Sequence, residues 1–189
     1  MFIILAGEPR SGKDTISRHW AADKGIEEVH PGHMIRDWAA AHEYPLKARE
    51  DFIKARAIMI EQNPDVFLEA IVGTEAEHVC VNGLRVVNIA RILQSDYHAK
   101  ILALECDPWR RFQRSLCAPD RAQKTVLSYQ DFLAQDAADH RSPESGEAAM
   151  ATIMRMADYT IRTGVSQELM LRRADDFLDS QLAATVANG

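Results

Sequence analysis

The sequence predicts an α/β fold in which a five-stranded parallel sheet carries helices on both faces. Two observations lead to this prediction. Five short apolar runs alternate along the chain with segments of helical character, and strands that are separated by helices normally pair in parallel. In addition, the first apolar run passes directly into a glycine-bounded loop and then into a helix. Such a strand–loop–helix junction is typical of a phosphate-binding site.

The expected strands span residues 2–6, 27–30, 78–82, 100–106 and 159–161. The runs at 2–6 and 100–106 are the clearest, because strands buried on both faces of a parallel sheet are apolar throughout. Helices are expected over 13–20, 34–41, 47–62 and 168–182. One more helix should start at Asn63 as N-cap, with Pro64 in the first helical position, and end at Gly73.

Length and composition indicate a single domain over residues 1–189. A chain of this length buries roughly 70% of its unfolded surface, and its hydrophobic content of 47% is enough for one core. The sequence shows neither a secretory signal nor a membrane-spanning run, and three cysteines without framework spacing favour reduced thiols, so a cytoplasmic protein is expected. The net charge of −6 disfavours a nucleic-acid partner, since polyanions are normally bound by a basic face.

The loop over residues 7–15 has the spacing G-x-x-x-x-G-K of a phosphate-binding loop. Its two glycines let backbone N–H groups turn toward a phosphate, and the following helix directs its positive dipole end at the same point. Lys13 adds a mobile charge that can reach the β- and γ-phosphates. Asp14 stands where a serine or threonine usually follows the lysine. We expect a nucleotide site here, rather than an ordinary turn, formed by Gly7, Arg10, Ser11, Gly12, Lys13, Asp14 and Thr15.

Arginines follow three of the expected strands. Arg36 comes after the second strand, Arg85 after the third, and Arg111 and Arg114 after the fourth, where they share one helix face. In an open α/β sheet, ligands collect beyond the carboxyl ends of the strands, so these side chains should reach the edge where the loop lies. Phosphoryl transfer between two anionic substrates needs such positive charge. Each arginine alone could be a solvated surface residue, but the set favours a functional interpretation.

Five short motifs resemble those of the P-loop nucleoside monophosphate kinase superfamily. The loop at 7–15 is similar to the adenylate-kinase form and to the loop of phage deoxynucleoside monophosphate kinases. G-H-M-I-R at 32–36 resembles the element G-D-x-L-R, and N-G-L-R at 82–85 resembles D-G-x-R. R-F-Q-R at 111–114 and A-D-Y-T-I at 157–161 resemble elements of dephospho-CoA kinases and archaeal adenylate-kinase-like proteins.

The resemblance implies a P-loop NTPase three-layer sandwich with a sheet of order 2-3-1-4-5, a helical acceptor-binding segment at about 31–73 and a lid at about 108–149. It also implies an enzyme of nucleotide metabolism that uses ATP and Mg²⁺ to phosphorylate a small phosphorylated acceptor, above all a nucleoside or deoxynucleoside monophosphate. In that comparison Arg36 and Arg85 hold the acceptor phosphate. Lys13, Arg111 and Arg114 are the catalytic residues, with the two arginines closing over the transferred group.

Two departures from these motifs bear on the metal. His33 replaces the acid of G-D-x-L-R, and Asn82 replaces the aspartate that helps to hold the magnesium water shell in such kinases. Asp14 could take over part of the metal-orienting role, or it could only complement the helix N-terminus, where acids are favoured. The departures leave two alternatives open: a kinase for another acceptor, such as a dephospho-CoA-like coenzyme precursor or a modified base in DNA, and a nucleotide-binding regulator without turnover.

Overall fold

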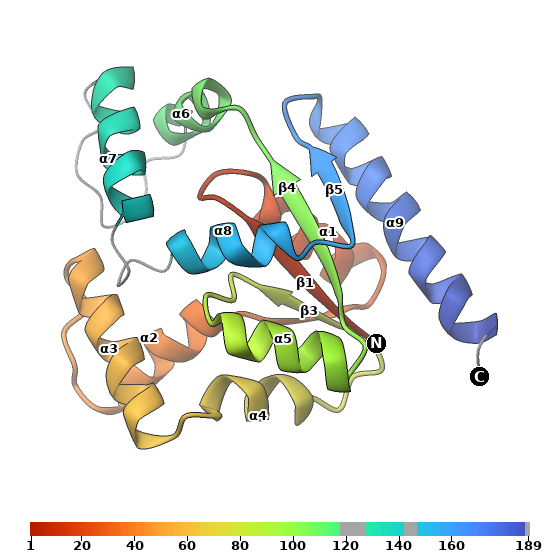
Figure 1. Cartoon of the computed structure of the whole chain (residues 1–189), viewed down its shortest axis with the longest axis horizontal. Helices are drawn as coiled ribbons and strands as arrows, with labels where there is room; N and C mark the ends of the chain where they lie inside the picture. The colour runs from red at the N-terminus through yellow and green to blue at the C-terminus, as the bar shows by residue number, and fades with distance from the viewer. Residues whose placement is uncertain (118–127, 142–146, 188–189) are drawn as a thin grey trace.

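The computed structural model describes residues 1–117, 128–141 and 147–187 of the chain. In these residues one five-stranded parallel sheet has the order β2-β3-β1-β4-β5, as predicted. The strands are β1 (Phe2–Gly7), β2 (Glu27–Val29), β3 (Val79–Asn82), β4 (Lys100–Glu105) and β5 (Tyr159–Arg162). Because β1 is central, the loop that follows it leaves from the middle of the sheet (Figure 1).

Helices cover both faces of the sheet, which confirms the three-layer sandwich (Figure 1). On one face lie α1 (Lys13–Asp23) and α9 (Gln167–Ala187), and on the other lie α5 (Val87–Asp96) and α8 (Glu147–Arg155). Three helices connect β2 with β3, namely α2 (Pro31–Ala41), α3 (Arg49–Gln62) and α4 (Val66–Val72). After β4, α6 (Pro108–Cys117) and α7 (Tyr129–Arg141) lie beyond the carboxyl end of the sheet.

Alternation along β1 divides its side chains between two cores. Ile3 and Leu5 pack with Trp20 of α1 and with the buried side of α9. Ile4 and Ala6 pack in the core that α5 and α8 cover. All four strand residues are at most 1% exposed. Because both faces are covered, β1 has no polar alternation, and this is why it was the clearest strand in the sequence.

The helix expected to start at Asn63 begins later, so that prediction was wrong. The helix α4 starts at Val66 with Asp65 as its N-cap, while Asn63 ends α3 in an extended conformation. Its Oδ1 accepts a hydrogen bond from the N–H of Asp65, and its Nδ2 donates to Glu69 Oε2 at 2.7 Å. Asn63 thus forms a turn between two helices, a role for which asparagine is equally suited. The predicted end of the helix at Gly73 is confirmed.

The range expected to bind the acceptor, 31–73, is occupied by α2, α3 and α4. In the range expected to form a lid, 108–149, α6 and α7 follow β4, whereas α8 begins at Glu147 and belongs to the layer on the sheet. Met150 and Ile153 of α8 are buried in the same core as Ile4. Residues 118–127 and 142–146 of the expected lid lie outside the described residues.

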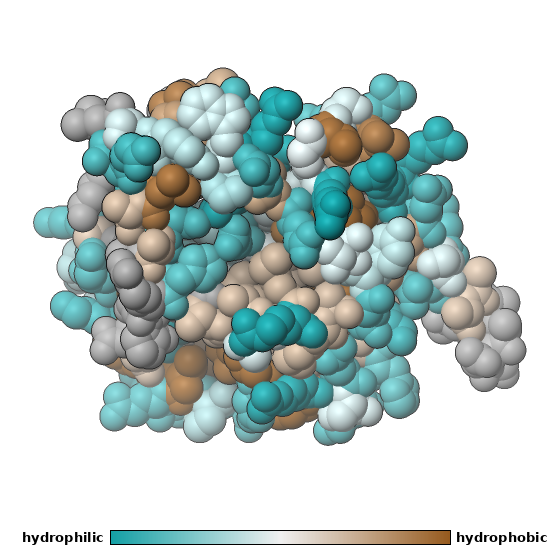
Figure 2. All heavy atoms as spheres, turned by 45° about the horizontal axis from the view of Figure 1, so that its top comes forward, coloured by the Kyte–Doolittle hydropathy of each residue, from teal (hydrophilic) through white to brown (hydrophobic). Residues whose placement is uncertain are grey.

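Among the described helices, none is long and apolar enough to cross a membrane. On the face shown in Figure 2, strongly hydrophobic residues occur in small separate groups among hydrophilic ones. Among the described residues, the large hydrophobic side chains that are exposed are spread over several elements, and only Trp109 and Leu116 share one, α6; the others are Tyr97, Tyr159 and Leu169. The site must therefore be sought among polar groups at the edge of the sheet.

Candidate functional site

The loop after β1 has the conformation that its glycines predict. Gly12 lies in the left-handed region with φ of 113° and forms the N-cap of α1. Its carbonyl oxygen accepts the N–H groups of Thr15 and Ile16, so the helix begins at once. A Cβ atom on Gly7 would lie 2.5 Å from Ser11 Oγ. Glycine is therefore required at position 12 by backbone conformation and at position 7 by lack of space.

The side chain of Lys13 folds back onto the first residues of this loop. It is only 8% exposed, and its Nζ donates to the carbonyl oxygens of Gly7 at 2.7 Å and Glu8 at 3.1 Å. A phosphate oxygen would compete with these carbonyls for the ammonium group, because an anionic oxygen is the stronger acceptor. The N-terminus of α1 lies at the same place, and the N-terminus of a helix favours binding of an anion.

Arg114 and Thr163 hold the loop from its outer side. Arg114 Nη1 donates to the carbonyl oxygens of Arg10 at 2.9 Å and Ser11 at 3.0 Å, and its Nη2 donates to Thr163 O at 2.6 Å. Thr163 Oγ1 donates to Ser11 O at 2.7 Å, and both Ser11 and Thr163 are fully buried. Arg10 is in the left-handed region with φ of 66°. In this structure Arg114 and Thr163 therefore support the shape of the loop, and the carbonyl oxygen of Ser11 is bound by both.

Two carboxylates and an amide meet where β2 and β3 end, beside Lys13. Asn82 Nδ2 donates to Asp14 Oδ1 at 3.0 Å and to Glu28 Oε1 at 2.8 Å. Burial would raise the pKa of Asp14, but the hydrogen bond from Asn82 and the charge of Lys13 outweigh it, so this pKa lies below its usual value. Asp14 is therefore ionised at neutral pH.

These residues fit a magnesium ion with its water shell. Mg²⁺ prefers oxygen ligands, keeps several of its waters and is bound through one or two carboxylates. Asp14 and Glu28 supply two carboxylates that share one amide. Asn82 is 1% exposed, and its Oδ1 is a buried acceptor to which the described residues offer no donor. A buried acceptor of this kind is usually satisfied by water or by a ligand, and Glu28 places a carboxylate beside Asn82, where the acid of the related motif is missing.

The segments after β2 and β3 touch each other through His30. The N–H of Gly32 donates to His30 Nδ1 at 3.0 Å, and the ring stacks on His33 with centroids 4.3 Å apart. On the other segment, a Cβ atom on Gly83 would lie 3.2 Å from His30 Cε1, and Gly83 has φ of 81°. Glycine at position 83 therefore permits both the turn and the close approach of the ring.

Charged groups surround this imidazole. Burial lowers the pKa of His30, and the neighbouring His33 and Arg36 add to the effect. Glu28 and Asp14 act in the opposite direction without reversing the shift. The ring is therefore neutral at pH 7, and it lies close enough to both carboxylates to belong to the same edge of the sheet.

Arg36 and Arg85 stand on the two segments that meet at His30. Arg36 is exposed on α2, where its Nη1 donates to Gly32 O at 3.3 Å and its guanidinium group lies over the ring of Phe52 at 5.4 Å. Arg85 is half-buried and comes two residues after Gly83. The structure thus brings the segments of both predicted arginines to the side of the site that β2 and β3 form.

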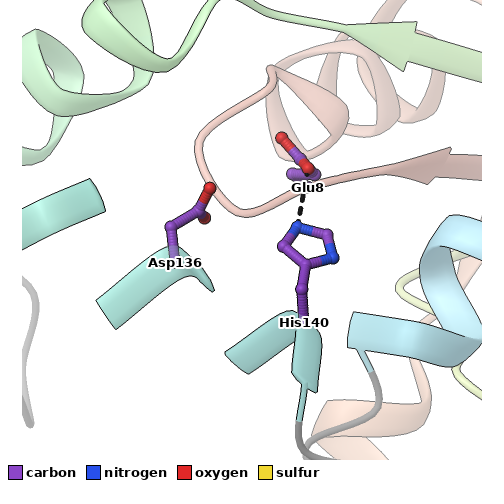
Figure 3. A group of neighbouring side chains, drawn as sticks. All are labelled: Glu8, Asp136 and His140. Atoms are coloured by element: carbon purple, nitrogen blue, oxygen red, sulfur yellow. Dashed lines mark hydrogen bonds and ion pairs between the residues drawn. The ribbon is translucent and has the colours of Figure 1, made fainter. Parts of the chain in front are cut away.

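Arg111 of α6 has a buried guanidinium group between the loop and α7. Its Nη1 and Nη2 donate to the two carboxylate oxygens of Asp136 at 2.8 and 2.6 Å, and Nη2 also lies 2.8 Å from Glu8 Oε2. His140 Nε2 lies 2.8 Å from Glu8 Oε1. Figure 3 shows Asp136 and His140 extending from α7 toward Glu8. We call Glu8, Arg111, Asp136 and His140 the Arg111 cluster, and it joins α7 to the loop.

Three members of the Arg111 cluster have the spacing of a metal site, since ligand atoms of Glu8, Asp136 and His140 lie within 4.8 Å of one another. However, Arg111 already contacts both carboxylates. Burial would lower the pKa of Arg111, but Asp136 and Glu8 hold it above its ordinary value, so the guanidinium is permanently charged. The cluster is therefore an ion-pair network in which the cation is an arginine.

Comparison with known proteins places this arrangement among kinase folds. No protein-family model matches the chain, and no curated protein sequence matches it. Shikimate kinase from Acinetobacter baumannii in complex with shikimate has a TM-score of 0.61 and 19% identity over 97% of this chain and 93% of that one. Shikimate kinase from Bacteroides thetaiotaomicron has a TM-score of 0.64 and 14% identity over 95% and 98%.

A deoxyadenosine kinase from M. mycoides with dCMP and dCDP bound has a TM-score of 0.57 and 10% identity over 95% of this chain and 100% of that one. This chain has the fold of the P-loop kinases. At these identities the likeness establishes the fold, and the substrate must be argued from the side chains of the site itself.

Six residues of the site were not predicted from the sequence: Glu8, Glu28, His30, Asp136, His140 and Thr163. Glu28 and His30 end the weak second strand, and the rule that ligands collect beyond strand ends would have singled them out. Glu8 lies inside the predicted loop, where an acid has no expected role in holding an anion. Asp136 is one of several acids on α7, and its local sequence carries no signal for a contact with Arg111.

Proposed function

We propose that this protein transfers the γ-phosphoryl group of ATP to the phosphate of a nucleoside or deoxynucleoside monophosphate. The observation that carries the proposal is the meeting of Lys13 with Asp14, Glu28 and Asn82 at one edge of a sheet with the P-loop kinase fold. In the reaction the bond between the γ-phosphorus and the oxygen that bridges the β- and γ-phosphates breaks. A bond forms between the γ-phosphorus and an oxygen of the acceptor phosphate. The products are ADP and a nucleoside diphosphate.

On the donor side, the loop N–H groups and Lys13 bind the β- and γ-phosphates. Lys13 exchanges the carbonyl oxygens of Gly7 and Glu8 for phosphate oxygens. Magnesium, when bound with ATP, neutralises charge on the phosphates. Asp14 and Glu28 hold its water shell, and Asn82 keeps the two carboxylates in place.

On the acceptor side, Arg36 and Arg85 bind the phosphate that is to be phosphorylated. A phosphate oxygen is already anionic, so this acceptor needs no general base, and its positioning decides the rate. Arg36 has the freedom to do this, because it is exposed and, within the described part of the chain, its side chain contacts Gly32 O and the ring of Phe52. Arg85 approaches from the neighbouring segment.

The two arginines of α6 have different tasks in this proposal. Arg114 acts through the loop, because its three carbonyl contacts fix the position of the N–H groups that receive the phosphates. Arg111 lies against Glu8 in the same loop. When ATP binds, a γ-phosphate oxygen competes with Glu8 and Asp136 for its guanidinium group, so Arg111 stabilises charge on the transferred group.

The test is ADP formation from Mg²⁺-ATP with a panel of acceptors: the ribo- and deoxyribonucleoside monophosphates, dephospho-CoA, deoxynucleosides, shikimate and single-stranded DNA. We expect turnover with one or more monophosphates. Lys13→Met is the matched control, because it keeps the length of the side chain without its charge and should abolish turnover while the fold remains intact. Turnover in this variant equal to that of the wild type would refute the assignment of the loop.

The acceptor clamp is tested by replacing Arg36 and Arg85 with lysine, singly and together. Each change should raise the acceptor KM much more than the ATP KM, because lysine cannot form the paired bonds of a guanidinium group. If both residues hold one phosphate, the two losses are non-additive. Additive losses, or a defect confined to ATP, would contradict a shared clamp.

A hydroxyl group is the second candidate acceptor. Glu28 supplies a carboxylate at the acceptor edge that could take the proton of a hydroxyl, and the structures of similar fold include kinases named for shikimate and deoxyadenosine. Turnover with shikimate or a deoxynucleoside, but with no monophosphate, would replace the proposal by this one. Binding of ATP without turnover for any acceptor would favour a nucleotide-binding regulator.

A further inference from the structure

Close packing holds the side chain of His30 in place on the acceptor side. Its ring lies where the segments after β2 and β3 meet, stacked on His33 on one side. Cβ atoms placed on Gly32 and Gly83 would approach Cε1 to 2.9 and 3.2 Å. Two glycines thus leave space for this ring and allow little movement. By contrast, the neighbouring Arg36 is an exposed and flexible side chain.

The hydrogen bond to Gly32 decides which nitrogen of the ring carries the proton. Gly32 N–H donates to Nδ1 at 3.0 Å, so Nδ1 acts as an acceptor and bears no hydrogen. In a neutral imidazole the hydrogen must then be on Nε2. Among the described residues, none forms a hydrogen bond with Nε2, and the ring is only half-buried. Nε2–H is therefore a donor of fixed direction that a ligand can reach.

The charged residues around His30 indicate what kind of ligand group Nε2–H binds. The ring lies within electrostatic range of Asp14, Glu28 and Arg36, which on the proposed function hold the metal and the acceptor phosphate. Donors fixed by packing orient a substrate better than exposed side chains do, because less conformational entropy is lost on binding. A nitrogen that already carries its hydrogen cannot take another proton while the ring stays neutral, so this nitrogen is no general base.

We propose that His30 positions the acceptor, with Nε2–H donating a hydrogen bond to an oxygen of the acceptor's phosphate. This inference rests on the proposed function and adds to it a residue that binds the acceptor and not ATP. It also favours a phosphate acceptor over a hydroxyl acceptor. A hydrogen-bond donor stabilises an anionic phosphate oxygen, whereas a hydroxyl that attacks needs a group to accept its proton.

The two roles of His30 can be separated by two substitutions. Asparagine places its Oδ1 near the position of Nδ1, so His30→Asn keeps the acceptor for Gly32 N–H and loses the donor at Nε2. Glutamine places its Nε2 near the position of the histidine Nε2, so His30→Gln keeps a donor there and loses the acceptor for Gly32 N–H. His98→Asn is the matched control, because His98 precedes the first residue of β4 and so lies at the amino ends of the strands, away from the site at their carboxyl ends.

We expect His30→Asn to raise the acceptor KM about ten-fold or more, as for loss of a hydrogen bond to a charged group, with the ATP KM and Tm unchanged. His30→Gln should lower Tm and keep the acceptor KM within about three-fold of wild type. A rise of about three-fold in KM corresponds to less than half of the free energy of one hydrogen bond to a charged group. The proposal is wrong if His30→Asn leaves the acceptor KM unchanged, or if the KM of both variants simply follows their loss of Tm.

A second measurement separates failure of this inference from failure of the proposed function. In protein with ¹⁵N-labelled histidine, long-range ¹H–¹⁵N correlation reports which ring nitrogen of His30 is protonated. Inorganic phosphate and dAMP are the probes, with His30→Gln to assign the signal. We expect the Nε2–H tautomer and a shift of Nε2 with dAMP. If no acceptor turns over, the proposed function fails while this result still supports the site. The Nδ1–H tautomer, or no shift with either probe, overturns the inference whatever the activity.

Discussion

Asp136→Asn tests the Arg111 cluster, which joins α7 to the P-loop. The substitution keeps the shape of the side chain and removes the charge that faces Arg111. Arg111 is 1% exposed, and two of its three short contacts go to Asp136, at 2.8 and 2.6 Å. The third, from Nη2 to Glu8 Oε2 at 2.8 Å, remains. The variant thus leaves a buried cation with half of its former compensation.

The magnitude follows from these contacts. Removal of one partner of a buried pair costs about 3–5 kcal/mol when the remaining charge is left uncompensated. Because Glu8 stays in contact and asparagine can still accept one hydrogen bond, we expect a loss of about 2–3 kcal/mol. For a chain of this size 1 kcal/mol shifts Tm by about 2–4 °C, so Tm should fall by roughly 4–12 °C.

Differential scanning calorimetry measures the change in Tm, and hydrogen exchange shows where it acts, with faster exchange expected in α7. Asp176→Asn, an exposed position on α9, is the control for loss of one carboxylate charge. Glu8→Gln and the double variant complete a cycle, which should be non-additive because both acids contact the same nitrogen. A fall in Tm for Asp136→Asn no larger than that of the control would refute the reasoning that Arg111 depends on this cluster.

Three further outcomes are expected. Gly83→Ala should destabilise the protein by at least about 1 kcal/mol, since φ of 81° and a Cβ 3.2 Å from His30 both oppose it; an unchanged Tm would contradict that close packing. The hydrogen bond that His19 Nε2 donates to the carboxylate of Asp175 raises the pKa of His19 above its usual value despite partial burial. This stabilisation is complete below about pH 6.5 and is lost as pH rises through the raised pKa. The Tm of wild type should therefore exceed that of His19→Gln by less at pH 9 than at pH 6. A Tm difference that grows with pH would contradict the raised pKa of His19. Glu28→Gln should raise the Mg²⁺ concentration for half-maximal rate several-fold and weaken Mg²⁺ binding to the ATP complex by calorimetry, whereas a change in Tm alone would make Glu28 structural.

Much of the fold could be predicted because its signals are local. The central strand β1 is apolar throughout, and the glycine and lysine spacing after it prescribes one backbone conformation, as Gly12 at φ of 113° shows. The strand order followed from the family resemblance. The helix α5 was not predicted, although Ile89, Ala90 and Leu93 lie on its buried side at helical spacing. Asn63 was assigned to the wrong helix end, because asparagine stabilises an N-cap and a turn through similar hydrogen bonds.

By itself, therefore, the sequence determined the α/β class, the glycine-bounded loop after β1 and the position of arginines after three of the strands. Each of these depends on neighbours along the chain or on the rule that parallel strands end at one edge. Only the tertiary structure decided that Asn82 joins Asp14 to Glu28, that the ring of His30 occupies the space over Gly83, and that Arg111 is buried between Glu8 and Asp136. The physical reason is that these pairings join residues from separate elements. Strand register and helix packing determine which residues meet, and the sequence around either residue does not indicate its partner.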